Sequence, residues 1–252
     1  MITALIDADS LIYAVGFSSN DVEESIAVSR LEQTMVELCM DLDCEDYKGF
    51  LTGKGNFRDD LAVTAPYKGQ RTSEKPVHFQ ALRCHLVTSW GFTVVKGIEA
   101  DDAVGIAAYA VPEDQTIMVH IDKDLNQFRG WHYNYRKKQK YYVSEFEGLV
   151  AFYTQILTGD RIDNIIGLKG IGPVKAKKIL ADCTNETELY QAVFEEYCSR
   201  CTDLLRPLTG EEKLDEQYLY DGMELAAKRI LENGQLLWLQ RKEHELWQLP
   251  QI

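Results

Sequence analysis

The sequence predicts an α/β protein with a mostly parallel central sheet flanked by helices, followed by a helical C-terminal region. Short apolar runs alternate with helix-periodic segments over the first 143 residues, whereas nearly every later segment has helical periodicity. Acidic side chains stand directly after several of the apolar runs. We therefore expect an α/β domain at 1–143 and a helical region at 144–252.

The alternation defines the individual elements. The run at 2–8 is apolar and ends in acidic residues, as expected for a buried strand. Residues 53–75 are polar and contain three glycines and a proline, which predicts an exposed loop. Together with the helix after it, this loop forms a region at about 53–90 that interrupts the domain. We expect strands at 2–8, 47–51, 92–95 and 116–121, helices at 22–40, 77–90 and 100–110, and a hairpin at 131–143.

The composition is that of a globular protein. Of the 252 residues, 45% are hydrophobic and 27% are charged. No apolar run approaches the roughly 18 residues that a membrane span needs. The N-terminus carries acids where a secretion signal carries bases. Six cysteines without an evident framework favour reduced thiols. These features predict a soluble protein of the cytoplasm (the host cytoplasm if the source is viral) with no membrane partner.

The charge is unevenly distributed along the chain. The net charge of −13 disfavours a nucleic-acid partner at first sight. Residues 160–180, however, hold five bases and two acids, and residues 136–140 hold four bases and no acid. A charge-mixed, solvated surface also explains the second of these groups. The first group coincides with a glycine-rich motif, which favours a phosphate partner.

The carboxylates follow successive predicted strands. In an open α/β sheet, functional groups gather beyond the carboxyl ends of the strands, so we expect these acids at one edge. Oxygen ligands without His or Cys favour Mg²⁺ or Mn²⁺, and two such ions can activate water for phosphodiester cleavage. A single acid after a strand is more often a helix cap, and only the recurrence predicts a metal site. The acids are Asp7, Glu99, Asp101, Asp102, Asp122, Asp124, Asp160 and Asp163.

A glycine-punctuated segment follows the last two acids. Backbone N–H groups at such a turn and at a helix N-terminus bind phosphate oxygens. Pro173 opens a short basic helix directly after the turn. The segment therefore predicts a grip on a nucleic-acid backbone without base specificity. Its candidate DNA-binding residues are Gly167, Lys169, Gly170, Gly172, Lys175, Lys177 and Lys178.

These motifs occur in a recognisable order. DAD, FRDDLAVTAPYKGQR, EADDAV, IDKDLNQ and TGDRIDNIIGLKGIGPVKAKKIL span about residues 1–180. Together they resemble the flap endonuclease/5′→3′ exonuclease family, of which the bacteriophage enzymes and the 5′-nuclease domain of DNA polymerase I are members. The small size resembles the phage or stand-alone bacterial forms. The resemblance implies a PIN-like 5′-nuclease core and a helix–three-turn–helix motif at about 158–181.

The resemblance also implies roles for single residues. The eight acids match the metal-ligand set, with Asp102 as an acid beside the site and with Asp101 and Asp122 as catalytic ligands. Lys68 and Arg71 match catalytic cations that contact the scissile phosphate and the DNA, and Tyr67 beside them is a candidate for base stacking. Two Mg²⁺ ions are implied, with Mn²⁺ as a substitute. In some members backbone carbonyls hold K⁺, at positions that match Leu168 and Ile171.

One departure from the family pattern concerns the second strand. Thr52 and Gly53 stand where the family usually has an Asp. Asp9, Asp59 and Asp60 are the candidates to compensate. A second departure, Ile166 in place of a common Pro, is expected to alter the rigidity of the loop. If the missing acid is not replaced, the metal requirement changes or one ion binds more weakly.

The resemblance implies a Mg²⁺-dependent 5′→3′ exonuclease and structure-specific flap endonuclease of DNA replication or repair. Its expected substrate is duplex DNA with a 5′ end, flap or junction, or an RNA–DNA hybrid. It is expected to be a monomer with a polymerase or other replication proteins as partners. A catalytically weakened DNA-binding scaffold is the alternative from another class. An RNA-directed nuclease of the PIN type ranks lower, because it lacks the glycine-loop grip.

Overall fold

The computed structural model describes residues 2–44, 46–72, 74–209 and 216–251. The chain forms two compact units. The sheet unit contains Met1–Phe57, Thr72–Glu145 and Leu239–Glu245, and the helical unit contains Arg58–Arg71, Phe146–Trp238 and Leu246–Ile252. This division differs from the predicted one in two segments. Arg58–Arg71 belongs to the helical unit, and Leu239–Glu245 belongs to the sheet unit. No helix in the described ranges is long and apolar enough to cross a membrane.

The sheet unit has six strands in the order β3-β2-β1-β4-β5-β6. The first five are parallel to their neighbours, and β6 is antiparallel to β5, which confirms the mostly parallel sheet and the hairpin. The polar loop predicted from residue 53 begins later, because β2 extends further than expected. The strands are β1 Thr3–Asp7, β2 Asp46–Asn56, β3 Thr93–Gly97, β4 Thr116–Val119, β5 Gly130–Asn134 and β6 Gln139–Val143.

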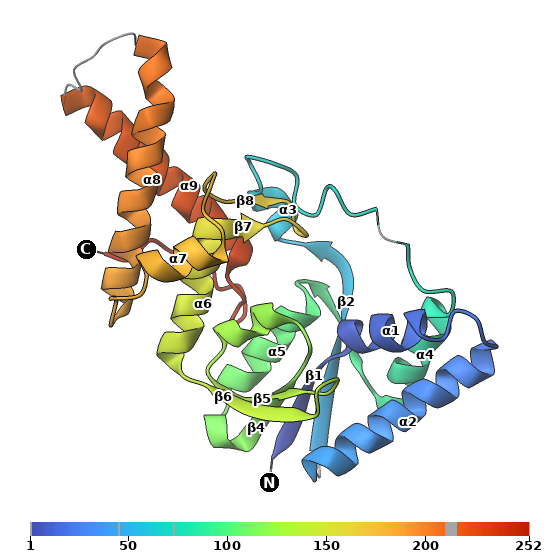
Figure 1. Cartoon of the computed structure of the whole chain (residues 1–252). Coiled ribbons are helices and arrows are strands. Elements are labelled where there is room, and N and C mark those ends of the chain that lie inside the picture. Colours follow the sequence, from blue (N-terminus) through green and yellow to red (C-terminus); the bar gives the residue numbers. More distant parts are fainter. Residues whose placement is uncertain (1, 45, 73, 210–215, 252) are drawn as a thin grey trace. The chain divides into compact units, whose positions relative to one another are not determined.

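Helices cover both faces of this sheet, because alternate side chains of the buried strands point to opposite faces. Ala4 and Ile6 of β1 pack with α1, α2 and α4, which lie together on one side of the sheet in Figure 1. Leu5 of β1 packs with Val104 of α5 on the other face. The sequence did not predict α1. The helices are α1 Ala8–Phe17, α2 Glu24–Leu42, α4 Phe79–Trp90 and α5 Ala100–Tyr109, with the 3₁₀ turns η1 Glu113–Gln115 and η2 Lys123–Gln127.

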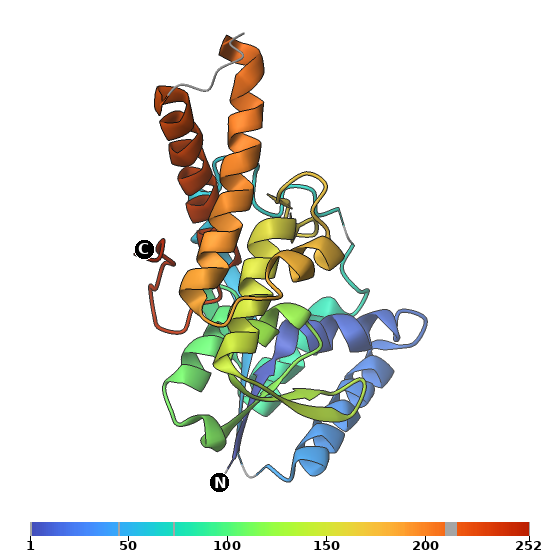
Figure 2. The same ribbon diagram turned by 60° about the vertical axis from the view of Figure 1, so that its left-hand side comes forward.

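The helical unit confirms the predicted C-terminal helices. Two antiparallel helices, α8 and α9, run side by side (Figures 1 and 2). A short two-stranded pair, β7–β8, lies between α6 and α7, in the segment for which the helix–three-turn–helix was predicted. The elements are α3 Arg58–Leu61, α6 Glu145–Thr158, β7 Gly159–Asp160, β8 Ile165–Ile166, α7 Pro173–Ile179, α8 Glu186–Thr209 and α9 Glu216–Leu237.

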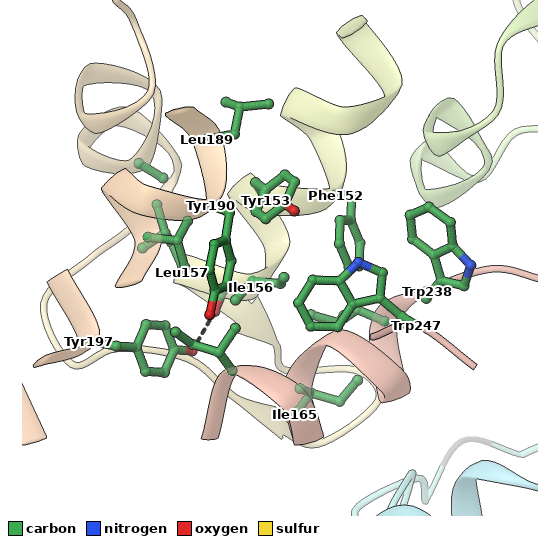
Figure 3. Close-up of a cluster of buried hydrophobic side chains, with 14 of the residues drawn as sticks. Phe152, Tyr153, Ile156, Leu157, Ile165, Leu189, Tyr190, Tyr197, Trp238 and Trp247 are labelled. Atoms are coloured by element: carbon green, nitrogen blue, oxygen red, sulfur yellow. Dashed lines mark hydrogen bonds between the residues drawn. The ribbon is translucent and has the colours of Figure 1, made fainter. Parts of the chain in front are cut away.

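Aromatic residues hold the helical unit together (Figure 3). Phe152 of α6 packs edge-on against Trp238 and Trp247, with ring centroids 4.8 and 5.4 Å apart. The buried hydroxyl of Tyr197 donates a 2.7 Å hydrogen bond to the carbonyl oxygen of Ile156, also on α6. α6 therefore enters a packed core directly before the motif that begins at residue 159, which fixes the start of that motif.

Candidate functional site

Buried negative charge is concentrated at the end of β1 in the sheet unit. Asp7 is the last residue of β1 and is only 7% exposed. Burial, followed by the negative charges of Asp9 and Asp122, raises the pKa of the Asp7 carboxyl to about 7. Three carboxylates thus act on one another at the carboxyl edge of the parallel sheet, as the strand pattern predicted. A cation at this edge is favourable because it removes the repulsion.

The second group of acids opens α5. Glu99 is the N-cap, and its side chain and that of Asp102 form a capping box. Asp102 is fully buried, and its two carboxylate oxygens accept the N–H groups of Glu99 at 3.1 Å and Gln240 at 3.0 Å. Asp102 therefore supports the start of α5 through these backbone contacts, and its assignment as a metal ligand stays a prediction. Glu99 and Asp101 lie in the same first helical turn.

The third group lies in the turn after β4. Asp122 caps η2, and one of its carboxylate oxygens accepts the N–H of Asp124 at 3.0 Å. Beneath this turn, His120 Nδ1 lies 2.5 Å from the carbonyl oxygen of Asp122, and His120 Nε2 lies 2.8 Å from His132 Nδ1. Both histidines are buried. The buried histidine pair therefore holds the backbone of the turn at Asp122, while the Asp122 side chain stays exposed. No spacing pattern of the histidines predicted this pair.

The chemistry of these donors fits a hard divalent cation, since all of them are carboxylate oxygens. Within the described residues, however, no three His, Cys, Asp or Glu side chains already stand close enough together to hold a metal ion. The fit therefore rests on the donor type and on the shared repulsion at Asp7. The residues of the sheet unit that fit are Asp7, Glu99, Asp101, Asp122 and Asp124.

The helical unit brings three predicted residues into contact. One carboxylate oxygen of Asp163 accepts a 3.0 Å hydrogen bond from Arg71, and the Lys68 ammonium lies 3.7 Å from the other. The backbone N–H of Lys68 also donates to the carbonyl oxygen of Asp163 at 2.9 Å. Asp160 caps the same turn by accepting the N–H of Asp163 at 3.1 Å. The assignment of Asp160 and Asp163 as metal ligands stays a prediction.

Tyr67 differs from its predicted role. Its side chain is only 8% exposed, and its ring belongs to the aromatic core of the helical unit. Its hydroxyl donates to Asp163 at 3.0 Å. A base cannot stack on a ring that is already packed on its faces, so the structure contradicts a stacking role. Tyr67 instead supports the carboxylate that Lys68 and Arg71 contact.

The glycines of the predicted phosphate grip serve two purposes. A side chain on Gly167 would lie 2.2 Å from the carbonyl carbon of Thr158, so this glycine allows close contact between backbone segments. Gly170 has φ +79°, a conformation that glycine adopts without strain. Gly172 is the N-cap of α7, and Pro173 follows at its first position. The turn is thereby held in one shape.

The basic residues of the grip are exposed and available to a ligand. Among the described residues, no carboxylate lies within salt-bridge distance of them, so an anionic backbone can contact each one. The predicted K⁺ carbonyl of Leu168 already accepts the N–H of Ile171 at 3.1 Å, and the K⁺ assignment remains untested. The exposed cations are Lys169, Lys175, Lys177 and Lys178.

Comparisons with known proteins agree with this arrangement. No family model matches the sequence. A 5′-3′ exonuclease of Mycoplasma pneumoniae is 29% identical over 210 residues, which are 70% of each chain. The structure of the T5 5′-exonuclease with zinc ions has a TM-score of 0.67 at 16% identity and covers 94% of this chain and 88% of that one.

A second solved structure gives the same result. The flap endonuclease D15 of bacteriophage T5, in a complex with DNA and metal ions, has a TM-score of 0.62 at 16% identity. It covers 93% of this chain and 89% of its own. This chain has the fold of the flap endonuclease/5′→3′ exonuclease family. The resemblance inferred from the order of the motifs is therefore confirmed, and within this 5′-nuclease fold the acids of the sheet unit lie at the strand ends where the sequence predicted them.

Proposed function

We propose that this protein is a metal-dependent 5′-nuclease that hydrolyses DNA phosphodiester bonds near 5′ ends or at junctions of single-stranded and duplex DNA. The observation that carries the proposal is the buried carboxylate of Asp7 at the carboxyl edge of a 5′-nuclease sheet, where the carboxylates of Asp9 and Asp122 repel it. The relatives named as exonuclease and flap endonuclease support it. We propose Mg²⁺ as the ion, with Mn²⁺ as a substitute.

The residues have separate tasks in this proposal. Asp7, Glu99, Asp101, Asp122 and Asp124 hold the ions, with Asp160 and Asp163 as further proposed ligands. A bound divalent ion lowers the pKa of water and stabilises the leaving oxygen. Lys68 and Arg71 place positive charge at the phosphate, where negative charge develops during cleavage. The loop at 167–172 and the lysines of α7 bind the duplex backbone, which implies little sequence preference.

A branched DNA with a labelled 5′ flap tests this function. We expect cleavage near the junction with Mg²⁺ or Mn²⁺ and none with EDTA. The Asp122→Asn variant should bind the same DNA without cutting it, and mapping the products separates exonuclease from flap activity. Unchanged turnover of Asp122→Asn contradicts the metal assignment.

A DNA-binding scaffold is the second candidate. It is favoured by Thr52 and Gly53, which stand in β2 where an acid was expected. For a scaffold, the branched DNA binds tightly at low salt but no product forms with either ion. Binding without cleavage by the unaltered chain therefore favours the scaffold over the enzyme.

A further inference from the structure

β2 cannot carry the expected carboxylate at Gly53, three residues before the strand ends at Asn56. A side-chain carbon on Gly53 would lie 2.1 Å from the carbonyl oxygen of Val95 on the neighbouring strand. Because that neighbour is backbone, it cannot rotate away as a side chain can. Thr52 has a side chain, but its hydroxyl accepts the N–H of Ala100, the first residue of α5, at 2.9 Å. Thr52 is therefore committed to the helix that carries Glu99 and Asp101.

The carboxylate of Asp9, on α1, contacts β2 at Thr52. One oxygen of Asp9 accepts the backbone N–H of Thr52 at 3.1 Å. The other lies 3.8 Å from the guanidinium of Arg83, which also donates to the carbonyl oxygen of Thr52 at 2.7 Å. Contacts on both carboxylate oxygens thus hold Asp9 beside Thr52 of β2. Its side chain is still 27% exposed, so an ion can reach it.

We propose that Asp9 supplies the metal-binding carboxylate that β2 lacks at Thr52 and Gly53, and that Thr52 and Arg83 are positioning residues for it. The inference rests on the proposed function. One hydrogen bond and one ion pair leave lone pairs on the Asp9 carboxylate, because a carboxylate has about four acceptor sites. Carboxylates that bind metals are commonly oriented by such outer contacts. Asp59 and Asp60, the other candidates, are exposed residues of the helical unit.

Metal binding without DNA tests the inference independently of cleavage. Mn²⁺ is titrated into the metal-free chain by calorimetry, with unbound Mn²⁺ followed by electron paramagnetic resonance. We expect Asp9→Asn to lose one bound ion or to raise the dissociation constant of one ion about tenfold or more. The matched control is Asp21→Asn, an exposed acid of the sheet unit, which should bind Mn²⁺ like the unaltered chain.

A second variant keeps the test decisive if Asp9→Asn does not fold. Asp9→Glu retains the charge but moves the oxygens by one methylene, so it should shift the Mn²⁺ dissociation constant if Asp9 is a ligand. The inference is overturned if Asp9→Asn binds the same number of Mn²⁺ ions as the unaltered chain with the same affinity. If Asp9→Asn is unfolded, the same result with Asp9→Glu overturns it.

The cleavage assay separates this inference from the proposed function. If the unaltered chain binds Mn²⁺ through Asp9 but does not cut branched DNA, the nuclease function fails and the ligand assignment stands. If it cuts DNA while Asp9→Asn binds Mn²⁺ normally, the nuclease function stands and the assignment of Asp9 fails.

Discussion

Lys68 and Asp163 are joined twice, by a 2.9 Å hydrogen bond from the Lys68 N–H to the Asp163 carbonyl oxygen and by a 3.7 Å contact between their charged groups. Lys68 also has φ +52°, so the backbone turns sharply at this residue. The predicted phosphate-contacting cation and a predicted metal ligand are therefore parts of one turn structure. The backbone bond holds the position of residue 68 whatever its side chain.

Lys68→Ala should therefore lose catalysis and keep the fold. The backbone hydrogen bond to Asp163 survives, whereas the charge that stabilises the reacting phosphate is removed. We expect the single-turnover cleavage rate to fall by about two to three orders of magnitude, with an unchanged circular dichroism spectrum. Lys54→Ala, an exposed lysine of β2, is the control and should cleave normally. A rate within twofold of the unaltered chain argues against a catalytic role for Lys68.

Asp122→Asn should abolish cleavage and leave DNA affinity largely intact. Asparagine keeps the oxygen that accepts the N–H of Asp124, so the turn holds its shape, but the charge that binds the ion is lost. DNA affinity is measured by fluorescence anisotropy in Ca²⁺ and the cleavage rate in Mg²⁺. Asp114→Asn, an exposed acid of η1, should behave like the unaltered chain in both measurements.

Asp7→Asn should stabilise the metal-free protein. The pKa of the Asp7 carboxyl is raised to about 7, so at pH 8 the folded chain holds a buried charge there. Because the unfolded chain loses this proton near pH 3.8, the free energy of unfolding falls as pH rises from 3.8 to about 7. Removing the charge should raise the free energy of unfolding in EDTA on the order of a few kcal/mol. Mg²⁺ should raise the melting temperature of the unaltered chain and have little effect on this variant. A less stable Asp7→Asn chain contradicts the prediction.

The buried histidine pair should make the protein sensitive to acid. Burial lowers the pKa of His120 to about 4, and burial together with the charge of His120 lowers that of His132 to about 3. The unfolded chain takes up these protons near pH 6.5 and the folded chain does not. Stability is therefore present at neutral pH and is lost as pH falls from 6.5 toward 4.

Urea unfolding at several pH values measures this effect. Asp7 contributes the opposite sign, so we expect a net loss on the order of 1 kcal/mol between pH 7 and 5 in the unaltered chain and a larger loss in Asp7→Asn. His132→Gln should flatten the profile, and His85→Gln, which alters an exposed contact to Glu32, should not. A profile of His132→Gln that parallels the unaltered chain contradicts the assignment.

Arg58 should be essential for the stability of the helical unit. Its side chain is 1% exposed and donates to the carbonyl oxygens of Leu236 at 2.9 Å and Trp238 at 2.8 Å. Arg58→Ala leaves these carbonyls without their donor, and we expect a loss of roughly 3 kcal/mol or more. Arg58→Lys should lose nearly as much, because one ammonium cannot reproduce the guanidinium fork. Urea unfolding measures both variants against the exposed control Lys54→Ala.

Local pattern predicted most of the secondary structure. The alternation around β1, the apolar run of β4 and the periodicity of α2 are properties of neighbouring residues, which a sequence displays directly. The helix α1 was missed because it begins at Ala8, immediately after β1, with no turn residue between them. The strand β2 was predicted too short because Gly53 and Gly55 predicted a loop, whereas the strand continues to Asn56 with a shift in its pairing to β3 between Thr52 and Asn56.

The sequence by itself determined the fold class, the position of the acids at the strand ends and the family resemblance, because residue type and order carry that information. Tertiary structure decided which groups are free to act. Burial removed Tyr67 from stacking, and two backbone N–H groups occupy the buried carboxylate of Asp102. Asp9 gained a role only because the chain brings it to Thr52, 43 positions away. Such contacts depend on which distant backbone donors the folded chain places beside each side chain.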